Sequence, residues 1–120
     1  MRVELCRKYN IAAAHYLPKA PEGHKCRNLH GHSYEIEVAV RGEVDRETGW
    51  LLDYGDIDER TRPVIAELDH RTLNEVPGLE NATSEVLCGW LWERLKDPLP
   101  GLYRISIAET CAAACHFYGE

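Results

Sequence analysis

The chain has 120 residues, 44% of them apolar and 28% charged, and its net charge is −6. This composition is typical of a globular protein, and the length predicts a single domain spanning residues 1–120. The negative charge argues against a nucleic-acid partner, because general nucleic-acid binding needs a basic face. No apolar run is long enough to cross a bilayer and no signal peptide is recognisable, so we expect no membrane partner.

The five cysteines lack framework spacing, which indicates reduced thiols and a cytoplasmic protein. Cys6 and Cys88 stand among apolar residues, and we expect both to fill the core. A domain this short has little room for a deep cleft of its own. We therefore expect an oligomer in which neighbouring chains share the walls of an active site.

Extended segments come first along the chain. Residues 2–14 are predicted to form a long strand, and residues 16–28, with two prolines and a glycine, a loop. From 31 to 44, apolar and charged side chains alternate with a period of two, which predicts a half-buried strand. A turn at 45–49 follows.

Two helices are predicted in the middle of the chain. The first spans about residues 54–68 and contains Pro63, which weakens the helix locally. After a loop, Thr83 or Ser84 caps the second helix, which ends before Pro98.

Two further strands are predicted at 103–110 and 113–118. The order strand, strand, helix, helix, strand, strand indicates an α+β domain. We expect a four-stranded antiparallel sheet with both helices on one face.

His30 and His32 form the strongest local signal, because positions i and i+2 of a strand point to the same face. His15 ends the first strand and lies across from this pair if the two strands form a hairpin. Three imidazoles without a fourth protein ligand are typical of a catalytic zinc site with an open position. The alternative is a surface pair of histidines. His24, in the loop, is either a spare ligand or a solvated side chain.

Cys26 lies four residues before His30 and between Lys25 and Arg27. A dication and cationic side chains favour the thiolate, which would suit Cys26 as a base or nucleophile. A metal ligand and an inert thiol are the alternatives.

Asp69 and His70 follow the first predicted helix, and an aspartate can orient the ring of a histidine that acts as an acid or base. From this dipeptide alone, an ordinary surface pair is the simpler interpretation. Glu109 stands near the end of an apolar strand, where it is either a solvated strand end or a ligand anchor.

Taken in order, short motifs cover nearly the whole chain. They are 13–18 (AAHYLP), 22–26 (EGHKC), 29–32 (LHGH), 49–53 (GWLLD), 68–70 (LDH), 73–74 (LN), 77–81 (PGLEN), 83–85 (TSE) and 109–111 (ETC). Together they closely resemble the 6-carboxy-5,6,7,8-tetrahydropterin synthases of the queuosine pathway, within the 6-pyruvoyltetrahydropterin synthase family. The resemblance implies the tunnelling fold (T-fold), a homo-oligomer assembled as a hexamer from two trimers, and active sites at subunit interfaces.

The resemblance also implies roles for individual residues. His15, His30 and His32 would hold Zn²⁺, Cys26 would be the catalytic thiol, and Asp69 and His70 its acid/base partners. Glu109 would anchor the pterin, in a pocket also lined by Thr83, Ser84 and Glu85. Charge alone suggests that Lys25, Arg27 or another basic group meets the substrate phosphates.

The spacing Cys-x3-His-Gly-His resembles the carboxy-forming branch of the family. The activity implied is conversion of 7,8-dihydroneopterin triphosphate to 6-carboxytetrahydropterin, acetaldehyde and triphosphate by a zinc-dependent lyase. The alternatives are 6-pyruvoyltetrahydropterin synthase activity, which keeps the side chain intact, and a non-catalytic zinc- or pterin-binding protein.

Overall fold

The computed structural model describes residues 1–120, and the predicted order of elements is confirmed. The elements are β1 (Arg2–His15), β2 (His30–Glu43), α1 (Tyr54–Ala66), α2 (Ser84–Leu95), β3 (Leu102–Thr110) and β4 (Ala113–Phe117). Each long loop holds one short 3₁₀ turn, Lys25–Arg27 in the first and Leu73–Glu75 in the second.

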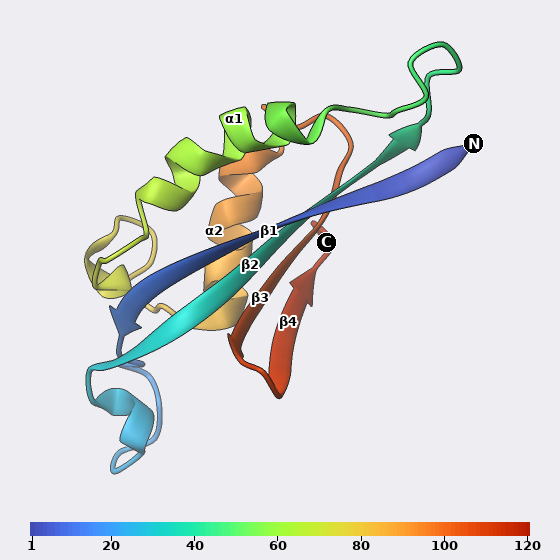
Figure 1. Ribbon diagram of the computed structural model, residues 1–120. Helices are drawn as coiled ribbons and strands as arrows, with labels where there is room; N and C mark the ends of the chain where they lie inside the picture. Colours follow the sequence, from blue (N-terminus) through green and yellow to red (C-terminus); the bar gives the residue numbers. More distant parts are fainter.

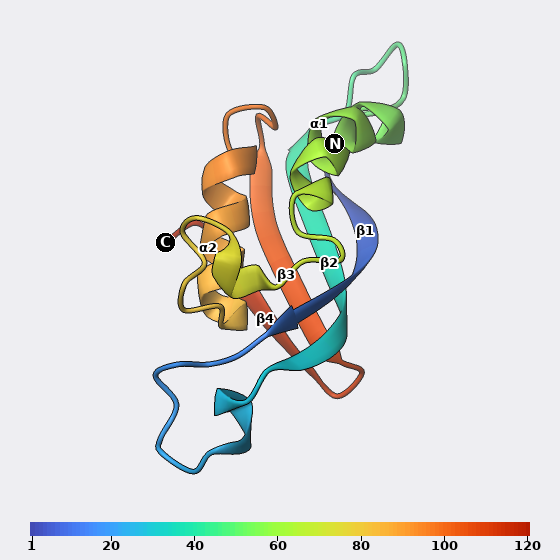
Figure 2. The same ribbon diagram turned by 90° about the vertical axis from the view of Figure 1, so that its left-hand side faces the viewer.

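The strands form one antiparallel sheet in the order β1-β2-β3-β4. Both helices lie on the same face of this sheet, and the loop between β1 and β2 extends beyond its end (Figures 1 and 2). The predicted α+β fold is therefore confirmed. Neither helix has the length and apolar character that crossing a bilayer requires.

Alternation along the strands builds the core. In β2 the side chains of Tyr34, Ile36 and Val38 are fully buried under the helices, while Glu35 and Glu37 point the other way. The helices contribute a second apolar layer, in which α2 supplies Leu87, Cys88, Leu91 and Leu95. The expectation that Cys88 fills the core is confirmed.

Both helices begin at side-chain caps. Asp53 accepts a hydrogen bond from the Gly55 N–H (2.8 Å), and Thr83 accepts one from the Val86 N–H (3.1 Å). Thr83 is one of the two residues predicted to cap α2, whereas α1 ends at Ala66, two residues before the predicted end.

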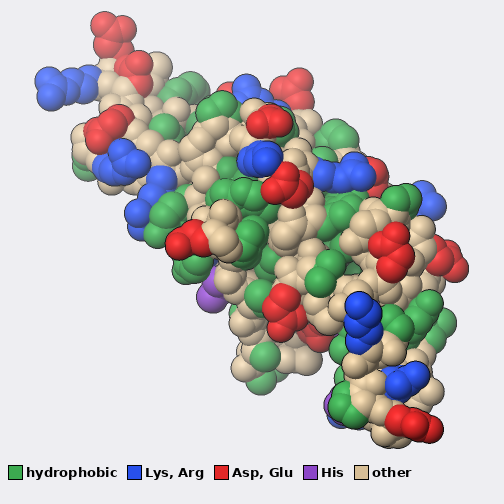
Figure 3. All heavy atoms as spheres, turned by 180° about the vertical axis from the view of Figure 1, so that it is seen from behind, with side chains coloured by type: hydrophobic (Ala, Val, Ile, Leu, Met, Phe, Trp, Pro, Cys, Tyr) green, Lys and Arg blue, Asp and Glu red, His purple; other side chains and the backbone are tan.

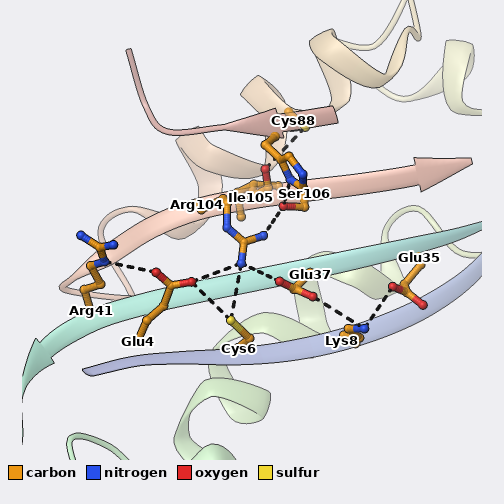
Figure 4. Close-up of polar contacts among 11 residues, drawn as sticks. Glu4, Cys6, Lys8, Glu35, Glu37, Arg41, Cys88, Arg104, Ile105 and Ser106 are labelled. Atoms are coloured by element: carbon orange, nitrogen blue, oxygen red, sulfur yellow. Dashed lines mark hydrogen bonds and ion pairs between the residues drawn. The ribbon is translucent and has the colours of Figure 1, made fainter. Parts of the chain in front are cut away.

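The expectation that Cys6 is buried in the core is wrong. Cys6 is exposed on the face of the sheet that the helices leave uncovered (Figure 4). It shares strand parity with Glu4 and Lys8, and its apolar neighbour Leu5 faces the opposite way. Parity within the strand, rather than the polarity of adjacent residues, decides its environment.

Charged side chains cross-link this uncovered face. The Arg104 guanidinium donates to Glu37 (2.6 Å) on β2 and to Glu4 (3.3 Å) on β1, so it ties three strands together (Figure 4). Lys8 lies 3.6 Å from Glu35 and 3.8 Å from Glu37. Opposite charges alternate across the strands and neutralise one another within the chain.

A separate ion pair fastens α1 to β1. The Arg7 guanidinium donates to both Asp58 carboxylate oxygens (2.8 and 2.9 Å), and the Tyr9 hydroxyl donates to one of them (2.7 Å). The hydrogen bonds from Arg7, followed by that from Tyr9, lower the pKa of Asp58 from 3.8 to about 2.

Replacing this carboxylate should change how stability depends on pH. Because the folded-state pKa lies below the ordinary value, the contribution of Asp58 is complete above about pH 4 and is lost as the pH falls towards 2. We expect Asp58→Asn to lower the free energy of unfolding by about 1–2 kcal/mol at pH 7, with the difference shrinking below pH 4.

Urea unfolding at a series of pH values measures this difference. Glu59→Gln is the matched control, because Glu59 is exposed on the same helix and makes no ion pair or side-chain hydrogen bond. The prediction would be contradicted if the difference in unfolding free energy between Asp58→Asn and the wild type stayed constant down to pH 3.

Candidate metal centre and active site

Strand pairing brings three histidines together. The register of β1 and β2 sets His15 opposite His30 and Ala13 opposite His32, so all three imidazoles project from the face that carries the core. One nitrogen from each ring lies within 4.8 Å of the others. The hairpin on which the predicted cluster depended is therefore present.

Backbone carbonyls fix the tautomers of two of these rings. His15 Nδ1 lies 2.7 Å from the Ala82 carbonyl oxygen, and His30 Nδ1 lies 2.7 Å from that of Asn28. A carbonyl only accepts, so each Nδ1 carries the proton and each Nε2 presents a lone pair. Burial lowers the pKa of His15, which favours the neutral form that binds metal.

Two of the remaining ring nitrogens lack a hydrogen-bond partner. Nε2 of His15 and Nε2 of His32 are buried and make no hydrogen bond. Buried polar atoms are rarely left unsatisfied, so these two point to a missing ligand. Three imidazoles suit a divalent transition metal better than the oxygen-preferring Mg²⁺ or Ca²⁺. The residues present therefore fit a metal ion.

A cavity of about 440 Å³ adjoins the histidine cluster. Its walls come from the ends of β1, β2 and β3 and from the first loop, and consist of His15, Leu17, Lys25, Cys26, His30, His32 and Glu109. Seen from behind, the end of the molecule that carries this loop projects at the lower right, and a notch separates it from the neighbouring projection (Figure 3). The structure thus places Cys26 and Lys25 in one cavity with the histidines.

Glu109 joins this cavity to a second one. The second cavity, of about 420 Å³, is lined by Glu109, by Thr83, Ser84 and Glu85 at the start of α2, and by β4. The Ser84 hydroxyl donates to one Glu109 oxygen (2.6 Å), and the other oxygen lies 3.7 Å from His32 Nε2. The carboxylate is held at the boundary, within reach of ligands in both cavities.

Asp69 and His70 lie elsewhere. The Ala12 N–H donates to the Asp69 carboxylate (3.0 Å), and the His70 N–H donates to the Ala12 carbonyl (2.6 Å), so both residues lie along the free edge of β1. Their carboxylate and imidazole are 3.0 Å apart, and the His70 side chain is 81% exposed. Within one chain, this pair is not part of the cavity that holds Cys26.

His70 also has an unusual backbone conformation. Its φ is +58°, and it is the one residue other than glycine with a positive φ. A histidine pays a steric cost there that glycine avoids, and such outliers cluster at functional sites.

The family described as 6-pyruvoyl tetrahydropterin synthase matches residues 4–120. The chain belongs to this family. A 6-carboxy-5,6,7,8-tetrahydropterin synthase from Synechocystis is 36% identical over 118 residues, which are 93% of this chain and 90% of the relative. A dihydroneopterin monophosphate aldolase from Pyrococcus furiosus is 33% identical over 112 residues, with 91% of each chain covered.

The fold of the family is also shared. The structure of Caenorhabditis elegans 6-pyruvoyl tetrahydropterin synthase matches with a TM-score of 0.91 and 29% identity. The match covers 100% of this chain and 97% of that chain. The resemblance recognised in the sequence motifs is confirmed at the level of family and T-fold.

Sequence reasoning missed the groups that support the site of this family member. The carbonyls of Ala82 and Asn28 leave no signal in the sequence, because every residue has one. The contact between Ser84 and Glu109 joins residues 25 positions apart, and only the packing of α2 on β3 reveals it.

Removing one imidazole should abolish tight metal binding. We expect His15→Ala to weaken metal affinity by more than about a hundredfold, since loss of even an outer partner of a metal-bound histidine costs about 10–100-fold. Metal content per chain after dialysis measures the effect. His116→Ala is the control, because His116 is exposed on β4 and lies outside the cluster. Equal metal content in both variants would contradict the prediction.

Proposed function

We propose that the chain is a 6-carboxy-5,6,7,8-tetrahydropterin synthase of queuosine biosynthesis, acting in the cytoplasm as one domain of residues 1–120. It would convert 7,8-dihydroneopterin triphosphate to 6-carboxytetrahydropterin, acetaldehyde and triphosphate. The observation that carries this proposal is the cavity in which the Cys26 thiol and three imidazoles face a common space. The name of the Synechocystis relative supports the same activity.

We propose Zn²⁺ as the ion held by His15, His30 and His32, because a three-histidine set leaves a coordination position open for substrate. When bound, Zn²⁺ supplies a Lewis acid that lowers the pKa of a coordinated hydroxyl.

The chain's own residues bind the pterin and move protons. The Glu109 carboxylate would accept two parallel N–H bonds from the amino-pyrimidinone edge, and the hydrogen bond from Ser84 keeps it oriented. Thr83 and Glu85 line the pocket on the far side of Glu109. Lys25, on the cavity wall, offers a positive charge to the phosphates.

Cys26 would act as the base at the carbon atoms of the substrate side chain. Its backbone is anchored in the loop, and its side chain contributes to the cavity wall beside His30. Proton removal next to a leaving triphosphate allows elimination. One water then adds at the first side-chain carbon as the bond to the second carbon breaks, which leaves a carboxylate on C6 and releases the other two carbons as acetaldehyde.

Asp69 and His70 would serve the site of a neighbouring chain. Their position at the free edge of β1, away from Cys26, suits a homo-oligomer in which this edge meets another subunit. We propose a hexamer built as a dimer of trimers. In this arrangement each thiol receives its acid/base partner from another copy.

Two other activities are represented among the relatives. 6-Pyruvoyl tetrahydropterin synthase activity would keep all the side-chain carbons on the pterin. The name of the Pyrococcus relative specifies a monophosphate rather than a triphosphate. Assays with both phosphate esters, combined with product masses, separate these possibilities.

Product analysis tests the activity directly. We expect the wild type to release acetaldehyde and triphosphate, and Cys26→Ser to lose about 10²–10⁴-fold in kcat, as expected for removal of a general base. Cys6→Ser is the control, because Cys6 is an exposed thiol on the uncovered face of the sheet. A product with three side-chain carbons, or full activity of Cys26→Ser, would contradict the proposal.

Mixed oligomers test the shared site. Cys26→Ala and His70→Ala should each be inactive alone, but oligomers assembled from equal amounts of both should regain about a quarter of wild-type activity. The gain arises because sites that combine an intact Cys26 with an intact His70 from different chains are restored. In the control, Cys26→Ala is mixed with the double variant Cys26→Ala/His70→Ala. No activity should return, because no chain then carries an intact Cys26. Inactive mixed oligomers would place Cys26 and His70 in the site of one chain.

A further inference from the structure

The first loop is organised around the backbone of Cys26. Its N–H donates to Nδ1 of His24 (3.1 Å), and its carbonyl accepts from the Leu17 N–H (2.7 Å). Both polar backbone groups of the residue that carries the thiol are therefore fixed. One of the two anchors is a side chain, and substitution can remove it.

His24 acts as the cap of a 3₁₀ turn. Its own backbone is extended (φ −71°, ψ 135°), and its ring accepts the hydrogen bond from the N–H of the second residue of the turn Lys25–Arg27. The His24 carbonyl also accepts from the Arg27 N–H (3.1 Å), which closes the turn. An unsatisfied N–H at the start of a helical turn is thus paired by a side chain, as in an ordinary N-cap.

The same turn leads directly to a metal-binding imidazole. Its last hydrogen bond runs from the Asn28 N–H to the Lys25 carbonyl (3.1 Å), and the Asn28 carbonyl fixes Nδ1 of His30 (2.7 Å). A continuous set of contacts therefore links His24, Cys26 and His30. The turn sets the position of the thiol relative to the metal cluster.

His24 is neither a ligand nor part of the cavity wall. It lies outside the group of three histidines whose nitrogens converge, and it does not line the cavity with Cys26. Its Nδ1 is occupied by the Cys26 N–H, so the interpretation as a spare metal ligand conflicts with the observed contact. Its exposed ring meets Cys26 only through the backbone.

We propose that His24 is a positioning residue, which caps the turn Lys25–Arg27 and holds the Cys26 thiol in register with the three histidines. The consequence for turnover rests on the proposed function, in which Cys26 is the base. The geometric part of the proposal does not rest on that function, because it concerns only the conformation of the loop. Asparagine is a good N-cap and supplies a short acceptor, so His24→Asn should keep the turn, whereas His24→Ala removes the cap.

The first test needs no substrate. The metal-loaded oligomer is treated with iodoacetamide, and the alkylation rate of each cysteine is followed by peptide mass mapping. We expect His24→Ala to alkylate at Cys26 about three to thirty times faster than the wild type, as loss of a cap frees the turn. His24→Asn should remain within about twofold of the wild type. Cys111 is exposed and serves as the internal control, with an unchanged rate in all three proteins.

The second test uses steady-state kinetics. With dihydroneopterin triphosphate, we expect His24→Ala to lower kcat about tenfold with KM within about twofold, because a displaced base affects chemistry more than binding. His24→Asn should restore kcat. A general loss of folding would instead shift the melting temperature and the Cys111 rate together.

The outcomes separate this proposal from the proposed function. Wild-type Cys26 alkylation in His24→Ala would overturn the positioning role. Loss of bound metal from His24→Asn would overturn it too, because that variant keeps the cap and removes only the imidazole. The expected alkylation pattern in a protein that leaves dihydroneopterin triphosphate unchanged would support the positioning role and reject only the proposed function.

Discussion

The pairing register of β1 and β2 is the constraint on which the site depends. The two strands pair residue by residue from Arg2 opposite Glu43 to His15 opposite His30. A slip of one residue would move every side chain of one strand to the other face. Burial of Ile11 and Tyr34, which also face each other, opposes such a slip. The apolar stripe that stabilises the fold therefore also aims the imidazoles at its end into one cluster.

The start of α2 completes the site from the opposite side. Packing of this helix on the sheet brings the Ala82 carbonyl to His15. It also brings the hydroxyl of Ser84, two residues further along the chain, to Glu109. Thr83, between them, caps the helix and fixes the direction of the chain at this point. One helix terminus thus orients an imidazole of the histidine cluster and a carboxylate, so its position is coupled to both halves of the site.

Much of this arrangement could be predicted from the sequence, because strand periodicity is a local property. The period of β2 predicted its buried face, and His-x-His at its start placed two imidazoles together. The error at Cys6 shows the limit of judging burial from adjacent residues when parity decides. Contacts across the fold, such as Ser84 with Glu109, and carbonyl acceptors such as that of Ala82 leave no trace in a single sequence. The edge position of Asp69 likewise follows from tertiary pairing with Ala12.

The distribution of unsatisfied atoms supports a ligand site at the histidine cluster. On the uncovered face of the sheet, Arg104 is compensated by Glu37 and Glu4, so this charged surface needs no further partner. Four buried side-chain nitrogens and oxygens have no hydrogen-bond partner, and two of them are the Nε2 atoms of His15 and His32. The ring of Tyr34, whose hydroxyl is a third, stands edge-on to the imidazoles of His15 and His32. Two neighbouring imidazoles with open lone pairs therefore mark the place where a metal ion can bind.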